Sequence, residues 1–226
     1  MSDPCHIAFV TIGNSPRDDI VPEMLDEIQA GLPDLSIRVS EVGVLDGLTD
    51  SALQHIMARD DEPAFATRCH DGSELTISVQ RTERRLIELL QDMDNDGYDL
   101  IVVLCTGTHI PKLAKTIVIE AQKVVDHAID ALSIGDGPLG IVLPFERQIS
   151  EFQERHKYEV AVNYAAASPY DGQQLADRVT SLSTCRATVM HCMGYTRAMR
   201  DQLRDALPHP VMNARGFVAA HVRQFL

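Results

Sequence analysis

Residues 100–109 read Leu100-Ile-Val-Val-Leu-Cys105-Thr-Gly107-Thr-His109, and this stretch decides the fold. Its first five residues are continuously apolar, without polar alternation, which predicts a strand buried on both faces in a parallel sheet. Residues 187–196, Ala187-Thr-Val-Met-His-Cys192-Met-Gly194-Tyr-Thr196, repeat the arrangement. In both stretches an apolar strand runs into Cys-x-Gly-x and then into a segment that we expect to begin a helix. Two such units in different halves of the chain predict two pseudo-equivalent lobes.

Apolar runs of strand length alternate with longer amphipathic segments along the whole chain, which predicts an α/β fold. We expect two pseudo-symmetric lobes, each a mostly parallel sheet flanked by helices, with the active-site cleft between them. The first lobe is predicted to contain residues 1–113 and 210–226, and the second residues 114–209. Strands are predicted at 6–12, 35–44, 65–68, 75–79, 100–104, 140–143, 158–164, 187–191 and 211–213. Helices are predicted at 18–30, 50–58, 82–93, 120–132, 146–157, 172–182, 196–207 and 214–226.

Charge and hydropathy exclude several classes of protein. The chain has 226 residues, and its 33 acidic against 20 basic side chains give a net charge of −13. Such a chain is a poor candidate for binding nucleic acid or an anionic membrane, because phosphate contacts need a basic patch. No apolar run approaches the roughly 20 residues that span a membrane. The first residues also lack the basic and apolar pattern of a signal peptide, so we expect a cytoplasmic protein.

The five cysteines form no C-x-x-C pair, which argues against a disulfide framework or a zinc site. A thiol at a strand end that begins a helix lies in the field of the helix N-terminus, which favours the thiolate. Two such thiols, Cys105 and Cys192, on opposite sides of a small carboxylate would form a two-base pair. A cysteine that ends a strand is also a common core residue, so this hypothesis depends on the matched pair. Cys5, Cys69 and Cys185 lack the Cys-x-Gly setting and are interpreted as structural.

Four strand ends are followed by loops rich in glycine and polar residues, and parallel strands bring such ends to one edge of a sheet. Hydroxyls, unpaired backbone N–H groups and an arginine are the groups that hold a carboxylate. The residues predicted to bind substrate are Thr11, Ser15, Arg17, Thr106, Gly107, Thr108, Glu146, Gly194, Tyr195 and Thr196. For Arg17, an ion pair with Asp18 or Asp19 is an equally good interpretation. The pattern G-x-x-x-x-G-K is not present, which counts against a phosphate loop.

Two histidines lie beside the cysteine loops. His191 precedes Cys192 directly and could tune that thiol, whereas His109 follows the first loop. Histidines in such places are more often solvated or hydrogen-bonded within the fold than catalytic, so we assign neither a role.

Several motifs carry a family resemblance, and they come in the family's order. They are Thr11-Ile-Gly-Asn-Ser-Pro-Arg17 with Pro22-Glu23, Gly97-Tyr-Asp99 before the strand at 100–104, Val142-Leu-Pro144 with Glu146, and His191-Cys-Met-Gly-Tyr-Thr196. Over nearly its whole length the chain resembles the AroM family, which is similar to the aspartate/glutamate/hydantoin racemase superfamily. The resemblance implies a cofactor-independent isomerase of two α/β lobes with one catalytic cysteine from each. Carried over, the catalytic pair falls on Cys105 and Cys192.

The resemblance implies a racemase or epimerase of a small carboxylate, with an amino acid as the first choice, and the chain could pair as a homodimer. Amino-acid racemases of the superfamily have Cys-Asn-Thr and Gly-Cys-Thr-His where this chain has Cys105-Thr-Gly and His191-Cys-Met-Gly. Maleate-type isomerases use one cysteine as a covalent nucleophile, and malonate-type decarboxylases use one as a proton donor. Both alternatives stay open, as does a non-catalytic accessory protein that binds a small carboxylate.

Overall fold

The computed structural model describes residues 4–32, 34–69, 71–170 and 175–226. The chain divides into two compact units, each described here by itself. The first contains residues 1–21, 29–122 and 226, and the second contains residues 22–28 and 123–225. Each unit contains one parallel sheet, which confirms the predicted α/β class with two lobes.

The sheet of the first unit has four parallel strands in the order β2-β1-β5-β6. Its strands are β1 (Cys5–Thr11), β2 (Ile37–Gly43), β5 (Leu100–Val103) and β6 (Ile117–Glu120). A separate antiparallel hairpin joins β3 (Ala64–Arg68) to β4 (Glu74–Ser78). The helices of this unit are α2 (Asp50–Ile56) and α3 (Val79–Met93). The helix α1 (Val21–Gln29) belongs to the second unit except for its first and last residues.

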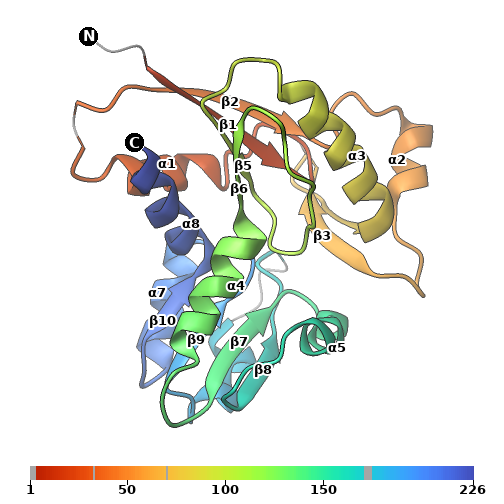
Figure 1. Ribbon diagram of the computed structural model, residues 1–226. Coiled ribbons are helices and arrows are strands. Elements are labelled where there is room, and N and C mark those ends of the chain that lie inside the picture. The colour runs from red at the N-terminus through yellow and green to blue at the C-terminus, as the bar shows by residue number, and fades with distance from the viewer. Residues whose placement is uncertain (1–3, 33, 70, 171–174) are drawn as a thin grey trace. The chain divides into compact units, whose positions relative to one another are not determined.

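The sheet of the second unit has four parallel strands in the order β8-β7-β9-β10, which Figure 1 shows side by side. They are β7 (Leu139–Leu143), β8 (Val162–Ala166), β9 (Ala187–Met190) and β10 (Val211–Asn213). The helices are α4 (Ala121–Leu132), α5 (Glu146–Arg155), α6 (Leu175–Arg178), α7 (Arg197–Ala206) and α8 (Ala214–Val222). Two 3₁₀ turns, η1 (Thr180–Leu182) and η2 (Arg223–Phe225), complete the elements.

The two sheets have the same topology. In each, the first strand pairs on one side with the second and on the other side with the third, and the fourth lies beyond the third. The element β5 is therefore equivalent to β9, and β6 is equivalent to β10. This equivalence confirms the pseudo-symmetry that the repeated strand–Cys–Gly motif predicted.

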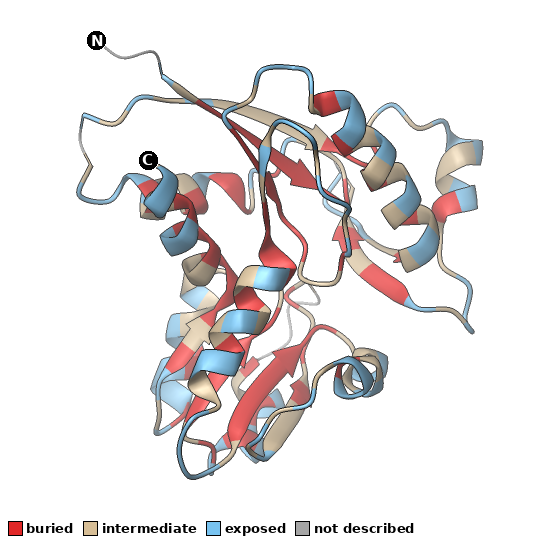
Figure 2. Ribbon diagram, in the orientation of Figure 1, coloured by how far each residue is buried: buried red, intermediate tan, exposed pale blue. Residues whose placement is uncertain are grey.

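Apolar strand sequence explains where each core lies. The strands β5, β7 and β9 are buried along their entire lengths, and β1 is buried after its first residue (Figure 2). Continuous burial is the environment that non-alternating apolar strands require, because helices cover both faces of a parallel sheet. The helices contribute one apolar stripe each; in α3 the buried residues are Thr82, Leu86, Leu90 and Met93.

Several expectations from the sequence differ from the structure. Residues 210–225 belong to the second unit instead of the first, because β10 forms a parallel ladder with β9, and residues 114–122 belong to the first unit instead of the second, because β6 pairs with β5. The strand expected at 158–164 begins only at Val162, and β6 was not expected at all. Part of the helix expected at 172–182 lies outside the described residues, and the remainder is α6 with η1. Strand pairing is non-local, so local sequence patterns did not reveal these partners.

Within the described residues, no helix is both long and apolar enough to cross a membrane.

Candidate functional site

Cys105 and Cys192 occupy equivalent positions at the carboxyl ends of two equivalent strands. The last ladder bond beside β5 runs from the Leu104 N–H to the Val10 carbonyl, at 2.8 Å. Its counterpart beside β9 runs from the His191 N–H to the Val142 carbonyl, also at 2.8 Å. In both units the cysteine is the next residue. The two thiols are therefore presented by the same backbone geometry.

Cys105 is buried, with 8% of its surface exposed, and packs within the apolar core of the first unit. Its carbonyl accepts a hydrogen bond of 3.1 Å from the Gln122 N–H at the start of α4. No helix follows Cys105: residues 104–116 are irregular and lead into β6. The expectation that a helix N-terminus acts on this thiol is therefore wrong. A side chain at Gly107 would meet the Phe65 ring at 2.6 Å, which explains the glycine in the loop.

Cys192 is half-buried, and its sulfur accepts a hydrogen bond from the Gly194 N–H at 3.3 Å. Gly194 is packed so closely that an added Cβ would lie 2.6 Å from the Tyr170 hydroxyl and from Pro169. A backbone N–H on the sulfur stabilises the thiolate over the thiol, because hydrogen bonds to the charged form favour it. Helix α7 begins only at Arg197, and the hydrogen bond that the structure shows at this sulfur comes from the loop.

The arginine expected to bind a substrate carboxylate already holds one from the protein. Arg17 is buried, and its Nε and Nη2 donate to the two oxygens of Asp19 at 2.7 and 2.8 Å. Its Nη1 donates to the Thr11 hydroxyl at 3.1 Å, so these two predicted residues do meet. Ser15 instead donates to Asp46 at 2.6 Å. The alternative interpretation of Arg17, an ion pair with a neighbouring aspartate, is the one that the structure contains.

Asp46 is a residue that the sequence reasoning missed. Its carboxylate accepts hydrogen bonds from the Ser15 side chain and N–H, from the Asn14 amide and from the Gly43 N–H. Burial alone would raise the pKa of Asp46, but these donors outweigh it and hold the pKa below its usual value. The carboxylate therefore fixes the loop after β1 to the loop after β2.

Polar residues surround the Cys105 loop in the first unit. The Thr108 hydroxyl is buried and donates to Glu120 at 3.4 Å, while Thr106 is half-buried. Glu120 ends β6 directly beside Val103 of β5 and is only 4% exposed. A carboxylate buried next to the strand end that presents Cys105 is a candidate site residue that the sequence reasoning missed. The sequence feature that could have revealed Glu120 was the apolar run Ile117–Ile119, which ends in this acidic residue.

Three other residues that were predicted to bind substrate lie in the second unit. Tyr195 is fully buried, and its hydroxyl donates to the Ala167 carbonyl at 2.6 Å. Thr196 is the N-cap of α7 and accepts a hydrogen bond from the Met199 N–H. Glu146 is the first residue of α5 and is exposed.

The two histidines have different surroundings. His109 is exposed, and its backbone N–H donates to the Glu83 carboxylate at 2.8 Å. His191 is 2% exposed, its Nε2 lies 3.1 Å from Asp126, and its ring meets Phe152 edge-on. His191 is thus a hydrogen-bonded histidine of the core, adjacent in sequence to Cys192.

A buried arginine holds the loop that carries Cys192. Arg215 is 0% exposed, and its guanidinium donates to the carbonyls of Met193 and Gly194 at 2.6 and 3.1 Å. Glu23 lies 3.3 Å from the same guanidinium and accepts the Arg197 N–H at the start of α7. This residue was missed because nothing local distinguishes Arg215 from a solvated arginine. The sequence feature that could have pointed to Arg215 was the Pro22-Glu23 motif, which contains its ion-pair partner.

No three His, Cys, Asp or Glu side chains gather as metal ligands anywhere in the described ranges.

Comparisons with known proteins place this architecture among racemases and isomerases. The glutamate racemase from Francisella tularensis in complex with D-glutamate has a TM-score of 0.59 at 9% identity, over 100% of this chain and 82% of that one. The allantoin racemase from Pseudomonas fluorescens has a TM-score of 0.60 at 14% identity, over 97% and 89%. The maleate isomerase from Pseudomonas putida has a TM-score of 0.53 at 13% identity, over 98% and 92%. At these identities the likeness shows the fold alone.

Curated proteins provide no match to the sequence. Among protein families, the one described as AroM protein matches residues 7–226, which is nearly the entire chain. The chain therefore belongs to the AroM family.

Proposed function

We propose that this protein is a cofactor-independent racemase or epimerase of a small carboxylate, with an amino acid as the preferred substrate. The observation that carries the proposal is the equivalent placement of Cys105 and Cys192, each one residue beyond the last ladder bond of its strand. The fold that the chain shares with glutamate and allantoin racemases supports it. Substrate binding by the loops after the two cysteines is part of the proposal.

Inversion at the carbon next to the carboxylate needs one group that removes a proton and a second group that supplies one. Two cysteines can fill these two roles. One cysteine, as thiolate, takes the proton from the carbon next to the carboxylate, and the electron pair of the broken C–H bond moves into the carboxylate. The other cysteine, as thiol, then gives its proton to the opposite face of that carbon. The product is the mirror image at that centre, and the two cysteines have exchanged protonation states. The Gly194 N–H, which donates to the Cys192 sulfur, would stabilise its thiolate form.

Proton exchange in deuterated water tests the proposal. Wild-type protein is incubated with single enantiomers of chiral amino and hydroxy acids, and the α-proton is followed by NMR together with optical rotation. We expect deuterium incorporation with inversion for at least one acid. Cys105→Ala and Cys192→Ala should each abolish inversion, while Cys69→Ala, a half-buried cysteine outside the motif, should not. No exchange with any acid would contradict the proposal.

A cis–trans isomerase is the second candidate, favoured by the shared fold of the maleate isomerase. In that reaction one thiolate adds to the double bond of an unsaturated diacid, the new single bond rotates, and the thiolate leaves. Intact-mass measurement with maleate would then detect an adduct on one cysteine only. Conversion of maleate without α-proton exchange on saturated acids would favour this function over racemisation.

A further inference from the structure

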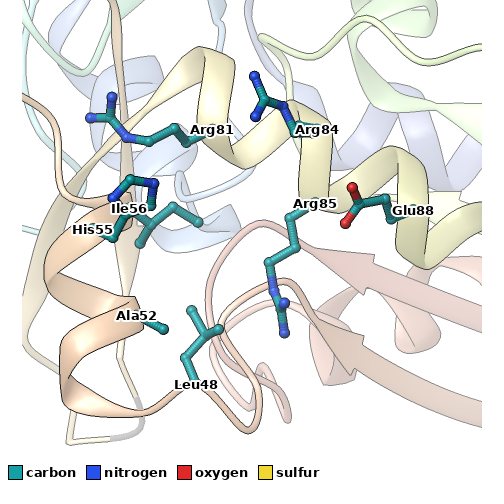
Figure 3. Close-up of a pocket in the computed structure, with 8 residues that line it drawn as sticks. All are labelled: Leu48, Ala52, His55, Ile56, Arg81, Arg84, Arg85 and Glu88. Atoms are coloured by element: carbon teal, nitrogen blue, oxygen red, sulfur yellow. The ribbon is translucent and has the colours of Figure 1, made fainter.

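A cavity of about 200 Å³ lies in the first unit between α2 and α3 (Figure 3). Its lining contains none of the residues predicted or proposed to bind substrate. The residues are Leu48, Ala52, His55 and Ile56 at α2, and Arg81, Arg84, Arg85 and Glu88 on α3. Since a water molecule takes up roughly 30 Å³, the space suits a ligand of about six heavy atoms.

Positive charge is concentrated at this cavity, although the chain as a whole carries a net charge of −13. Arg81, Arg84 and Arg85 are spaced by three and four residues, so they share one face of α3. Like charges at this spacing destabilise a helix. The first turn of α3 also contains no acidic residue, although acids are favoured there. Glu62 offsets part of this charge through its ion pair with Arg81, and no described carboxylate pairs with Arg84.

The three arginines differ in how many of their N–H groups have a hydrogen-bond partner within the protein. Arg81 donates to Glu62 and to the Met57 carbonyl, but its buried Nε has no hydrogen-bond partner within the described chain. Arg85 is held by the carbonyls of Val44 and Asp46 through Nε and Nη2, which leaves its Nη1 edge available.

Arg84 makes no hydrogen bond or ion pair with any residue that the structure describes. Figure 3 shows the Arg85 side chain extending toward Leu48, whereas the Arg84 guanidinium extends in the opposite direction in this view. Glu88 is the one acid in the lining, and together with Glu62, which pairs with Arg81, it leaves one of the three positive charges without a compensating carboxylate.

The remainder of the lining is apolar. It therefore favours anions that carry a hydrocarbon group over inorganic anions. Ala52 and Ile56 of α2, and Leu48 just before it, supply hydrocarbon surface. An inorganic anion would gain nothing from this surface, whereas a short hydrocarbon body would be removed from water. Guanidinium groups match the planar geometry of a carboxylate. We propose that this cavity is a second binding site, separate from the cysteine motifs, for a small organic carboxylate with a short apolar body.

The proposal is tested by NMR titration of the full-length ¹⁵N-labelled protein at low salt with isobutyrate. Isobutyramide, which has the same shape without charge, and inorganic phosphate, which has charge without hydrocarbon, are the comparison probes. We expect isobutyrate to shift the amides of α2 and α3 and the Arg81 Nε–H signal. It should bind at least tenfold more tightly than isobutyramide and at least fivefold more tightly than phosphate.

Two variants and one matched control locate the site. Arg84→Gln removes a charge without removing a contact, and should weaken isobutyrate at least fivefold. Ala52→Phe fills the cavity and should abolish the shifts. Arg59→Gln removes an exposed positive charge of the same unit that does not line the cavity, and should leave binding unchanged. Equal weakening by Arg59→Gln and Arg84→Gln, or binding that survives Ala52→Phe, would overturn the proposal.

Discussion

At the scale of single residues, the second unit depends on polar groups that are buried and satisfied. Arg215 joins the Met193 and Gly194 carbonyls to Glu23, although it is 0% exposed. A buried charge is tolerated only where partners replace its hydration. The same carbonyls belong to the loop whose N–H reaches the Cys192 sulfur. Stability and the proposed chemistry therefore share these residues.

Replacing Arg215 by Met should lower the free energy of unfolding by about 3 kcal/mol, because it leaves the Met193 and Gly194 carbonyls without their donor and Glu23 without its ion-pair partner. Urea denaturation measures the change. Arg223→Met, an arginine at the end of α8, is the control and should cost under about 0.5 kcal/mol. The double variant Arg215→Met/Glu23→Gln should cost less than the sum of its single changes, since the two residues interact. Strict additivity would contradict the inferred pair.

Tyr195→Phe should be destabilising by about 1–3 kcal/mol, because the Ala167 carbonyl is left buried without its donor. Tyr98→Phe is the matched control: that hydroxyl makes no hydrogen bond to any described residue, and the change should cost under about 0.5 kcal/mol. Thermal unfolding of both variants compares them. Equal transition temperatures would show that the Tyr195 hydroxyl has no structural role.

At the scale of elements, helix α7 begins at a defined point beside the Cys192 loop. The Thr196 hydroxyl accepts the Met199 N–H at 3.1 Å, and Glu23 accepts the Arg197 N–H at 2.9 Å. Both bonds satisfy N–H groups that the first turn of a helix leaves unpaired. Together they place the last residues of the Cys192–Thr196 loop.

Thr196→Ala should lower the free energy of unfolding by about 1 kcal/mol, which is the usual contribution of an N-cap oxygen. Thr196→Ser keeps that oxygen and should lose a few tenths of a kcal/mol at most. Hydrogen exchange at the first turn of α7 reports the local effect, with faster exchange expected for Thr196→Ala alone. If both variants behave alike, the hydroxyl is not the cap.

At the scale of the whole molecule, histidines that are buried or half-buried should make the protein less stable in mild acid. Burial lowers the pKa of His6, His156 and His209, with Arg38 adding to the effect at His6 and Asp126 opposing it at His156. The unfolded chain then binds more protons than the folded one at pH values between the folded and unfolded pKa values. This contribution to stability is complete above about pH 6.5 and is lost as the pH falls through the folded values.

We expect the urea midpoint to fall between pH 7.5 and pH 5.5. The fall should be smaller in His156→Gln/His209→Gln than in wild type, whatever the variant's stability at pH 7.5. Replacing His127, an exposed histidine of α4, by Gln should leave the slope unchanged. A midpoint that rises on acidification would contradict the downward direction of these pKa shifts.

The sequence by itself determined the α/β class, the parallel sheets and the repeated strand–Cys–Gly motif. These features depend on local apolar runs and spacing, which fold the same way wherever they lie. The positions of Cys105 and Cys192 at strand ends follow directly, because a strand ends where its apolar run ends. Likewise, Asn213 precedes the last helix in sequence and caps it in the structure.

Only the tertiary structure decided which polar side chains are paired or buried within the protein and which could contact a ligand. Arg17 is paired with Asp19, Tyr195 lies in the core, and Arg215 is buried beneath the Cys192 loop. It also placed β10 in the second sheet and left the Cys105 loop without a helix. Pairing and burial depend on residues far away in the chain, and a polar side chain has the same local sequence whether it faces a ligand, a partner or water.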